Sequence, residues 1–423
     1  MNIQNRTIYC KDNLDILKGI DSETVDMIYL DPPFNSKKQW NAPVGTNAEG
    51  ASFKDTWTKD DIKEEWVDAI RAEYPELHAF LNSFKLWGQE SDVAYIIYMA
   101  VRIIECRRIL TSTGSLFYHC DHVMNDYVKI MLDIIFGRGN DVNNIVWCYE
   151  TSGKGKSTLP KKHDNIFFYS KTDQYKFKMP MTEANSKNIT SYNKVDEDGN
   201  RYYMRSGKYK VVYNPLKPRN DWWADDEVKP LTNNHSERTG YPTQKPLSLL
   251  RRIIEMTTDE GDIVLDPFCG CATTCVAAEQ IGRRWVGIDV SIKAYELVKQ
   301  RLHADVNNHG QLSLDSPEHI DINFSTTPPV RNAIQSAEKK WVYIISNESF
   351  DGEYKVGIAT NWKSRLNSYQ TSDPNRGYKL EYKIETPNYM ELEKAVHTYF
   401  DNRHEWVRAE LNDIIDFIIN HNE

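Results

Sequence analysis

The sequence predicts a doubly wound α/β fold with a mostly parallel sheet, followed by a small α+β domain at the C-terminal end. Short runs of β-branched and aromatic residues alternate with stretches of helical periodicity up to about residue 300, which is typical of parallel sheets. A segment rich in Asn, Ser, Pro and Asp follows at residues 304–339 and is expected to be a linker. Residues 340–423 carry strand and helix signals of their own, so they are predicted to fold separately.

Seven runs are predicted to be the buried strands of the large sheet, at residues 6–10, 25–30, 115–119, 145–149, 166–169, 262–265 and 285–288. Two regions interrupt this rhythm. Residues 35–56 contain Gly, Pro and Asn with little periodicity, and are predicted to be a mobile loop. Residues 172–234 are polar, basic and aromatic, so they are predicted to be an insertion between the two halves of the sheet domain, 1–171 and 235–303.

The composition indicates a globular, water-soluble chain, since hydrophobic residues make up 40% and charged residues 27% of the 423. The longest apolar stretch, 94–110, is interrupted by Arg102, Glu105, Arg107 and Arg108 and is therefore not expected to cross a membrane. No basic and then apolar leader begins the sequence, so export is not expected. Most of the seven cysteines lie in apolar runs, which suits a reducing cytoplasm.

The net charge of −9 conceals a basic segment. Residues 151–220 hold twelve Lys and three Arg against six Asp and Glu, a balance of 12 + 3 − 6 = +9, so the other 353 residues sum to −18. A basic segment on an acidic body is what binding to nucleic-acid phosphates requires. Charge alone does not separate this interpretation from a solvated, lysine-rich loop.

An acidic residue, two prolines and an aromatic residue end the predicted strand 25–30. Asp31 is expected at the edge of the sheet where ligands bind in open α/β folds, and Pro32 and Pro33 have no backbone N–H groups. An aryl amine could donate its N–H groups to the Asp31 carboxylate and the Pro32 carbonyl, while Phe34 stacks on the ring. Such bonds would aim the nitrogen lone pair at an electrophile. The Asp-Pro-Pro run also occurs by chance at acidic turns.

Residues 262–274 predict a strand, a tight loop of small residues and the start of a helix. Gly270 permits a ligand to approach the backbone closely, and Thr273 and Thr274 are expected to cap the helix. About 20 residues later Asp289 ends another strand, at the spacing at which a carboxylate meets a ribose hydroxyl. Both halves of a nucleoside-binding crevice are therefore predicted. The residues expected to line this crevice are Asp266, Pro267, Phe268, Gly270, Thr274 and Asp289.

Three cysteines lie in and directly after the same loop, namely Cys269, Cys271 and Cys275. Three thiols around the start of a helix fit tetrahedral zinc poorly, and no fourth ligand lies nearby in the sequence. No metal is therefore expected in this domain.

The two constellations, in this order, resemble the β class of DNA amino-methyltransferases, in which the catalytic motif precedes the cofactor loop. The resemblance covers roughly residues 5–300 and includes further family segments at 11–17, 114–121, 163–171 and 241–246. It implies a permuted, Rossmann-like methyltransferase fold, S-adenosyl-L-methionine as cofactor and double-stranded DNA as substrate. Residues 1–171 would then be the catalytic half of the domain and residues 235–303 the cofactor-binding half.

The resemblance also implies roles for individual residues. The residues implied to be catalytic are Asp31, Pro32, Pro33 and Phe34, acting on a base flipped out of the duplex. Further cofactor contacts are implied at Asp12, Thr243 and Lys245. An acid in the place of Asp31 favours N6 of adenine, because relatives that act on N4 of cytosine more often carry Ser there. Cytosine, an RNA target and a non-catalytic DNA-binding protein are the less favoured alternatives.

One position departs from the family. Where the family usually has Gly-Ser-Gly, this chain has Gly270, Cys271 and Ala272. Because alanine is small, altered or weaker cofactor packing is expected at Ala272 rather than loss of binding.

Residues 172–234 are interpreted as the target-recognition region, in which basic side chains hold phosphates while other side chains read base edges. For Trp222 and Trp223, packing in the core is favoured over stacking on DNA. The residues expected to contact DNA are Lys176, Lys178, Lys208, Lys210 and Arg219.

In the C-terminal region, the runs 341–345 and 354–357 predict a hairpin, followed by a helix that carries an acid and a histidine on one face. Over residues 340–410 the pattern resembles a divergent branch of the GIY-YIG nuclease fold, although Val342 stands in place of the first signature glycine. The alternatives are a DNA-binding module and, for the acid and histidine, a plain amphipathic helix. The residues implied for phosphodiester cleavage with Mg²⁺ are Tyr343, Arg365, Glu393 and His397.

The expected partner is double-stranded DNA, and no membrane is expected. A second copy of the chain and a cognate restriction endonuclease are further candidate partners. An active C-terminal nuclease would instead make the chain a combined restriction–modification enzyme.

Overall fold

The structure is a computed structural model that describes residues 1–149, 157–183, 191–214, 216–232, 234–308, 321–331, 340–359, 362–403 and 405–422. The chain divides into two compact units, residues 1–66 with 79–330 and residues 67–78 with 331–423. The chain passes between the units in helix α2 (Glu64–Glu73), in helix α3 (Pro75–Trp87) and after residue 330. Residues 309–320 and 332–339 of the expected linker lie outside the described residues.

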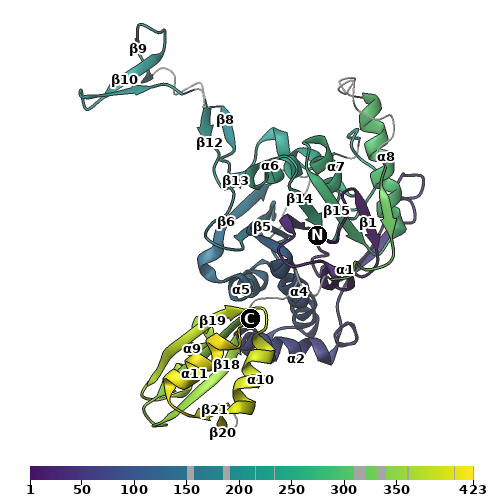
Figure 1. The fold of residues 1–423 in the computed structure, drawn as a ribbon. Helices are drawn as coiled ribbons and strands as arrows, with labels where there is room; N and C mark the ends of the chain where they lie inside the picture. Colours follow the sequence, from purple (N-terminus) through teal and green to yellow (C-terminus); the bar gives the residue numbers. More distant parts are fainter. Residues whose placement is uncertain are drawn as a thin grey trace. The chain divides into compact units, whose positions relative to one another are not determined.

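A nine-stranded sheet forms the centre of the first unit (Figure 1). Its only antiparallel member is β7, which pairs with β5 and β6, while all the other neighbours run parallel. The predicted fold class is confirmed. Each predicted strand is present, with the predicted ends at 25–30 and with shifted ends elsewhere. The order is β13 (Trp222–Trp223), β6 (Asp141–Cys148), β7 (His163–Ser170), β5 (Leu110–Cys120), β2 (Val25–Leu30), β14 (Ile263–Asp266), β15 (Arg284–Asp289), β1 (Thr7–Cys10) and β16 (Asn323–Ser325).

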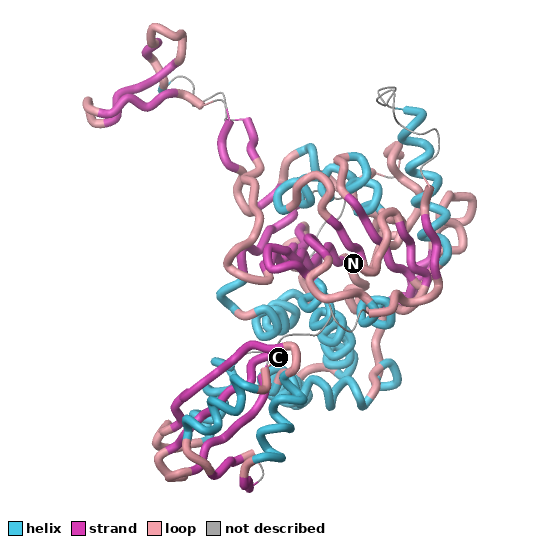
Figure 2. Tube along the Cα trace, in the orientation of Figure 1, coloured by secondary structure: helices cyan, strands magenta, loops and turns pink. Residues whose placement is uncertain are grey.

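Helices cover both faces of this sheet (Figure 2). On one face α4 packs against its neighbours α1 and α5, and on the other face α7 packs against α6 and α8. The bounds are α1 (Asn13–Gly19), α4 (Glu90–Ile109), α5 (Asn125–Phe136), α6 (Leu247–Thr257), α7 (Thr273–Gln280) and α8 (Ile292–Asn308). Short 3₁₀ turns lie at Lys59–Asp61, Arg138–Asn140 and Asp226–Val228.

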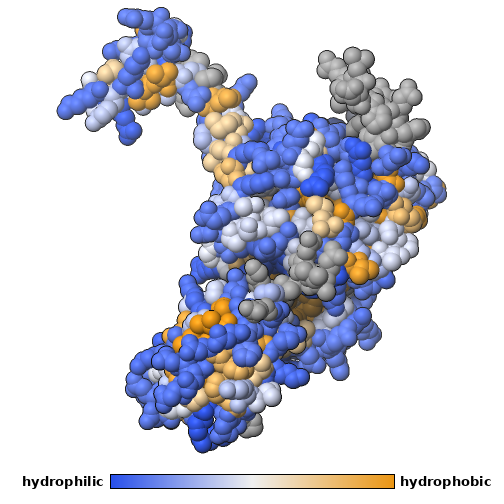
Figure 3. Space-filling model, in the orientation of Figure 1, coloured by the Kyte–Doolittle hydropathy of each residue, from blue (hydrophilic) through white to orange (hydrophobic). Residues whose placement is uncertain are grey.

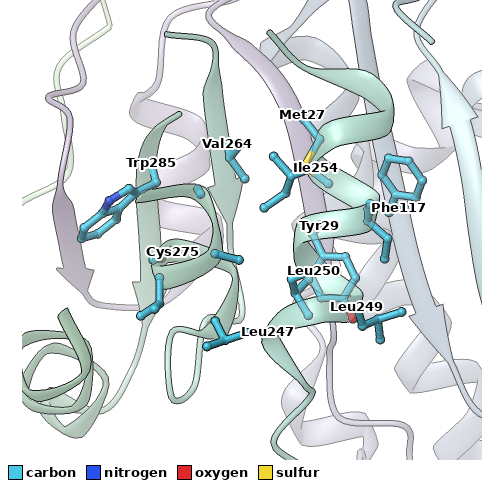
Figure 4. Packing of buried hydrophobic residues seen from close by; sticks show 14 of the residues in the cluster. Met27, Tyr29, Phe117, Leu247, Leu249, Leu250, Ile254, Val264, Cys275 and Trp285 are labelled. Atoms are coloured by element: carbon cyan, nitrogen blue, oxygen red, sulfur yellow. The ribbon is translucent and has the colours of Figure 1, made fainter. Parts of the chain in front are cut away.

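The core beneath α6 shows why its sequence forms a helix at this place. Leu250 and Ile254 are four residues apart and therefore share one face, which is buried. Figure 4 shows these side chains pointing toward Met27 and Tyr29 of β2, within one cluster of buried residues. Both faces of the parallel strands are covered, so the strands are apolar almost throughout.

The apolar stretch 94–110 is mostly α4, which is buried on most of its surface. Among the described residues, no helix is both long and apolar enough to span a bilayer.

Three expectations about irregular segments are wrong. Residues 35–56 are not a loop throughout, because β3 (Lys38–Asn41) and β4 (Ser52–Asp55) form an antiparallel hairpin. The expected linker contains β16, which adds to the edge of the sheet beside β1. The insertion ends earlier than residue 234, because β13 pairs with β6 and Trp223 is buried in the core, as favoured, whereas Trp222 is exposed.

The rest of the insertion consists of short antiparallel strands. β8 (Met181–Glu183) pairs with β12 (Leu216–Pro218), and β9 (Lys194–Val195), β10 (Arg201–Arg205) and β11 (Tyr209–Val212) form a three-stranded sheet. None of the described residues in 191–214 is buried. Apolar side chains are also exposed on the β8–β12 ribbon, at Met181 and Leu216 (Figure 3). This region therefore has little hydrophobic core of its own.

In the second unit, the described residues from 340 onward form a five-stranded antiparallel sheet and three helices, which matches the α+β prediction. Val342, Val356, Val396 and Ile414 belong to its buried core. The strand order is β19 (Tyr378–Thr386), β17 (Lys340–Asn347), β18 (Glu353–Ala359), β21 (Trp406–Arg408) and β20 (Asp401–Arg403). The helices are α9 (Trp362–Ser372), α10 (Tyr389–Tyr399) and α11 (Leu411–Asn420).

Candidate active site

A cavity of about 620 Å³ opens at the carboxyl ends of β1, β2, β14 and β15. Parallel strands bring their carboxyl ends to one edge of the sheet. The acids at or just after the ends of these four strands therefore meet there, although they lie far apart in the sequence. The cavity is lined by every catalytic and cofactor residue predicted for this unit: Asp12, Asp31, Pro32, Pro33, Phe34, Thr243, Lys245, Asp266, Pro267, Phe268, Gly270, Thr274 and Asp289.

An ion pair joins the two halves of the domain inside this cavity. Lys245 Nζ lies 2.5 Å from Asp31 Oδ2, and the two side chains are 8% and 19% exposed. The ammonium also lies 5.5 Å from the centre of the Phe34 ring. Two residues before Lys245, Thr243 has a φ of 61°, which is a rare conformation for a β-branched residue. The pair holds one oxygen of Asp31 and leaves the other for a ligand.

Asp289 is held by the cofactor loop. Its Oδ2 accepts a hydrogen bond from Gly270 N at 2.9 Å, and its Oδ1 accepts one from Ser291 N at 2.8 Å. Burial raises the pKa of the Asp289 carboxyl to about 6, although these two donors pull it down. Gly270 has a φ of 50°, and a Cβ there would lie 2.9 Å from the Tyr241 ring, so glycine is required.

Asp266 lies deeper, at the end of β14. Its Oδ1 accepts from Phe268 N, and its Oδ2 accepts from the Thr274 hydroxyl at 2.5 Å. Burial raises the pKa of Asp266 to about 7, against the effect of these bonds. The expectation that Thr273 and Thr274 cap α7 is therefore wrong, because the residue at the N-cap is Ala272 and no side chain caps the helix.

Ala272 does not line the cavity but is fully buried in the core, so the expectation of altered cofactor packing there is not supported. Its backbone is left-handed, with φ 55° and ψ 36°. The family's glycine is thus explained by backbone conformation rather than by contact with a ligand.

Replacing Ala272 by glycine is expected to change the free energy of unfolding by no more than about 1 kcal/mol. Glycine relieves the strain of the left-handed conformation, and this gain offsets two losses, the buried methyl group and the greater entropy of the unfolded chain. Replacing it by valine should destabilise the protein by at least about 2 kcal/mol, since a β-branched residue fits neither this conformation nor the packed core. Urea unfolding of the three proteins checks this. Equal stability of the glycine and valine variants would contradict it.

Asp12 is held by a cation that sequence reasoning did not assign to the site. Both Asp12 oxygens accept from Arg102 Nη2, at 3.0 and 2.9 Å, and Arg102 is fully buried. Arg102 Nε also donates to Asn13, whose amide donates to Pro267 O at 2.8 Å. Helix α4 is thereby connected to the cofactor loop. The available signal was an arginine inside an otherwise apolar stretch.

The β3–β4 hairpin forms a second part of the wall that the sequence did not reveal. Trp40 stacks on Phe53 and Phe53 stacks on Tyr241, with ring centres 6.3 and 6.2 Å apart. Asp55 joins the hairpin to the segment after Phe34, accepting from Asn35 N at 2.6 Å and from the Ser36 hydroxyl. This wall of the cavity is therefore aromatic. It was not predicted from the sequence, because alternation of polar and apolar residues in strands this short gives almost no signal.

The residues predicted to contact DNA do not gather at one place. Lys176 pairs with Asp262 at 2.5 Å and Lys178 pairs with Asp259 at 2.6 Å, beside the amino end of β14 and therefore at the other edge of the sheet from the cavity. Lys210 pairs with Asp196 at 2.8 Å. Arg219 pairs with Asp225 and Glu227, while Lys208 is exposed in the turn between β10 and β11.

In the second unit the structure gathers the four residues proposed for cleavage around a small polar cluster. Tyr343 OH lies 3.1 Å from Tyr369 OH, and the Arg365 guanidinium lies 5.2 Å from the Tyr369 ring. His397 Nε2 lies 3.1 Å from Val356 O, on the strand next to β17. Burial raises the pKa of Glu393, which interacts with His397.

Within the described ranges, no group of three or more His, Cys, Asp or Glu side chains is arranged to hold a metal ion. Cys269, Cys271 and Cys275 are buried and free, and burial raises the pKa of each thiol.

Comparison with known families gives the deciding observation, a match of residues 25–300 to the family described as DNA methylase. The chain belongs to the DNA methylase family. The match contains the part of the cavity lining from Asp31 to Asp289, so the first unit contains a DNA methyltransferase domain. Residues 340–423 match a second family, the T5orf172 domain.

Relatives of this DNA methylase are similar over much of their length. The type II methyltransferase M.EcaI of Enterobacter cloacae is 26% identical over 293 residues, which cover 56% of this chain and 64% of that protein. The DNA adenine methyltransferase YhdJ of Escherichia coli K12 is 26% identical over 314 residues, which cover 72% of this chain and 84% of that protein. Among solved structures, the M1.HpyAVI–SAM complex matches with a TM-score of 0.39 and 18% identity, over 70% of this chain and 98% of that one.

Proposed function

We propose that this DNA methylase transfers a methyl group from S-adenosyl-L-methionine to N6 of adenine in double-stranded DNA. One observation carries the proposal: Asp31, which can bind an amine, and Asp289, which can bind a ribose, line the same cavity. The volume of about 620 Å³ lies within the range of sites for small molecules and cofactors.

The residues present suit S-adenosyl-L-methionine, which supplies an electrophilic methyl group when it is bound. The Asp289 carboxylate has lone pairs left to accept the ribose hydroxyls beyond its two backbone donors. Phe268 and the Tyr241 ring offer apolar surfaces beside it. Asp12, which is held by Arg102, provides another acid in the part of the cavity wall that Lys11 and Asn13 also line.

The chain's own residues would promote transfer by position and charge. The free oxygen of Asp31 and the Pro32 carbonyl accept the two amine hydrogens and turn the nitrogen lone pair toward the methyl group. As the nitrogen–carbon bond would form, the bond between sulfur and the methyl carbon would break and leave a neutral thioether, while the nitrogen would become positive. The Asp31 carboxylate would stabilise this charge. Asp31 is then placed to receive the proton that the methylated nitrogen loses. Phe34 forms the surface on which the extruded base stacks.

The family resemblance favours adenine over cytosine, because relatives that act on N4 of cytosine more often carry Ser in the place of Asp31. Incubation with plasmid DNA and methyl-labelled cofactor, followed by hydrolysis to nucleosides, tests the choice. We expect label in N6-methyldeoxyadenosine. Label in N4-methyldeoxycytidine would overturn the base assignment, and no label in DNA would overturn the proposal.

Cofactor affinity is expected to rise with pH between about 5 and 7. The carboxyl of Asp289 has a pKa raised to about 6 and must be ionised to accept the ribose hydroxyls, so protonation below that value competes with binding. At pH 5 the affinity should be about tenfold weaker than at pH 8. Calorimetric titration with the cofactor measures this, and Asp289→Asn should remove the part centred near pH 6. A flat profile in the unaltered protein would contradict the assignment.

We also propose that basic side chains of the insertion, residues 172–234, bind DNA phosphates. Lys208 is exposed, and Lys210 is also exposed although it pairs with Asp196 and lies over the Tyr202 ring, so both are accessible to a phosphate. Lys176 and Lys178 support this less, since a phosphate would compete with their aspartate partners on the other edge of the sheet.

For the second unit we propose binding to DNA phosphates through Arg365 and Lys355, with nuclease activity as the alternative that the GIY-YIG resemblance suggests. The Lys355 ammonium lies 4.9 Å from the centre of the Tyr369 ring, as the Arg365 guanidinium lies 5.2 Å from it. The described acids and histidines do not fit a Mg²⁺ site by themselves, so we derive no cleavage step. Incubation of the full chain with Mg²⁺ and unmethylated plasmid tests the alternative. Nicking that Tyr343→Phe abolishes would establish a nuclease.

A cognate restriction endonuclease and a second copy of this chain are the further proposed partners. The first is suggested by the similarity to type II methyltransferases.

A further inference from the structure

A buried histidine lies behind the Phe34 ring and outside the cavity. His119, on β5, is fully buried and its ring stacks on Phe34, with ring centres 5.9 Å apart and 25° between the planes. Phe34 lines the cavity, whereas His119 does not. The family resemblance assigned no role to this residue, and the mechanism above does not use it.

Hydrogen bonds at both ring nitrogens hold His119 in one orientation. Its Nδ1 lies 2.9 Å from Tyr29 OH, and its Nε2 lies 3.1 Å from Asp164 Oδ2. The other oxygen of Asp164 accepts from Tyr149 OH at 3.1 Å. The chain of bonds crosses the adjacent strands β2, β5 and β7 and ends at Tyr149, directly after β6, at the edge of the sheet that carries Asp31.

The charges define which way the bonds run. Although burial opposes ionisation, the bond from His119 holds the pKa of the Asp164 carboxyl below its usual value. Asp164 is therefore an acceptor, and His119 Nε2 carries the hydrogen of this bond. Every polar group on the ring is satisfied, so rotation of the ring would break two buried hydrogen bonds.

We infer that His119, fixed by Tyr29 and Asp164, is a positioning residue that holds the Phe34 ring as the wall against which the flipped base stacks. The inference rests on the proposed function. Phe34 itself has no polar atom to orient its ring, and it follows two prolines, so its angle depends on what packs behind it. The adjacent Trp147 ring meets His119 edge-on at 5.5 Å and closes the remaining side.

The test is the variant His119→Phe, which keeps a ring behind Phe34 but removes both hydrogen bonds. We expect KM for DNA to rise about tenfold, because the Phe34 ring is no longer held at one angle and the flipped base stacks on it less favourably. Cofactor affinity should remain within about twofold, because the cofactor residues Asp266 and Asp289 lie on other strands. DNA that carries a mismatch at the target base should restore much of the loss, since its base is extruded at lower cost.

Tyr118→Phe is a matched control. Tyr118 is the neighbour of His119 on β5 and is also fully buried. Its hydroxyl lies 2.7 Å from Tyr95 OH, and it does not line the cavity. Both variants should lose some thermal stability, but only His119→Phe should change KM for DNA. If His119→Phe does not fold, His119→Gln, which retains a donor toward Asp164 but no ring, takes its place.

The outcomes separate this inference from the proposed function. If the unaltered protein methylates DNA and the His119 variant has an unchanged KM, or a loss that mismatched DNA does not relieve, the inference is wrong while the proposed function stands. If the unaltered protein transfers no methyl group, the proposed function fails and the inference fails with it.

Discussion

Replacing Asp31 by alanine is expected to lower the rate of methyl transfer by about a thousandfold or more, because both the orientation of the amine and the stabilisation of its charge are lost. Cofactor affinity should stay within about threefold, since the residues around Asp289 do not depend on Asp31 for their hydrogen bonds. Single-turnover transfer to plasmid DNA and calorimetric titration with the cofactor measure the two quantities separately.

Two further variants sharpen this prediction. Asp31→Asn keeps an oxygen that can accept one amine hydrogen but loses the charge, so its rate should fall between those of the alanine variant and the unaltered protein. Asp15→Ala removes an exposed acid on α1, 52% exposed and paired only with Lys11, and should leave the rate unchanged. Substantial activity in the alanine variant would refute the catalytic role of Asp31.

Replacing Asp289 by alanine is expected to weaken cofactor binding about a hundredfold, because hydrogen bonds to a charged group contribute about 1.5–3 kcal/mol each. The change also leaves the N–H groups of Gly270 and Ser291 without their acceptor, which loosens the loop around the ligand. Equilibrium titration at pH 8, above the raised pKa of Asp289, measures the full effect.

Asp289→Asn should bind with intermediate affinity, since its amide oxygen still accepts a hydrogen bond. Asp31→Ala serves as the opposite control, because it should spare binding and abolish transfer. An alanine variant at position 289 that binds the cofactor within threefold of the unaltered protein would show that the ribose is held elsewhere.

The strands and the acids at their ends were predictable because both depend on local sequence. A buried parallel strand needs a continuous apolar run, and β2 and β14 each carry one that stops at Asp31 and Asp266. Once the strands are parallel, their carboxyl ends must meet at one edge, so Asp31 and Asp289 could be placed together from the pattern alone. The need for glycine at position 270 was likewise predictable, because the tight loop of small residues around it is visible in the sequence.

Contacts between distant segments were not predictable in the same way. Lys176 and Lys178 resembled phosphate-binding residues until the fold placed Asp259 and Asp262 beside them. The hairpin at 38–55 has strands of only four residues each, too short for periodicity to distinguish from a loop.

By itself, the sequence determined the fold class, the cavity edge and the acids of the DNA methylase site, because each follows from the order of apolar and polar residues along one strand. Only the tertiary structure decided what holds those acids and the Phe34 ring in place. Lys245 reaches Asp31 across 214 positions, Arg102 reaches Asp12 across 90, and His119 reaches Tyr29 across 90. Such partners are selected by distance in space, and a single sequence carries no record of which side chains the packing will bring within hydrogen-bonding reach.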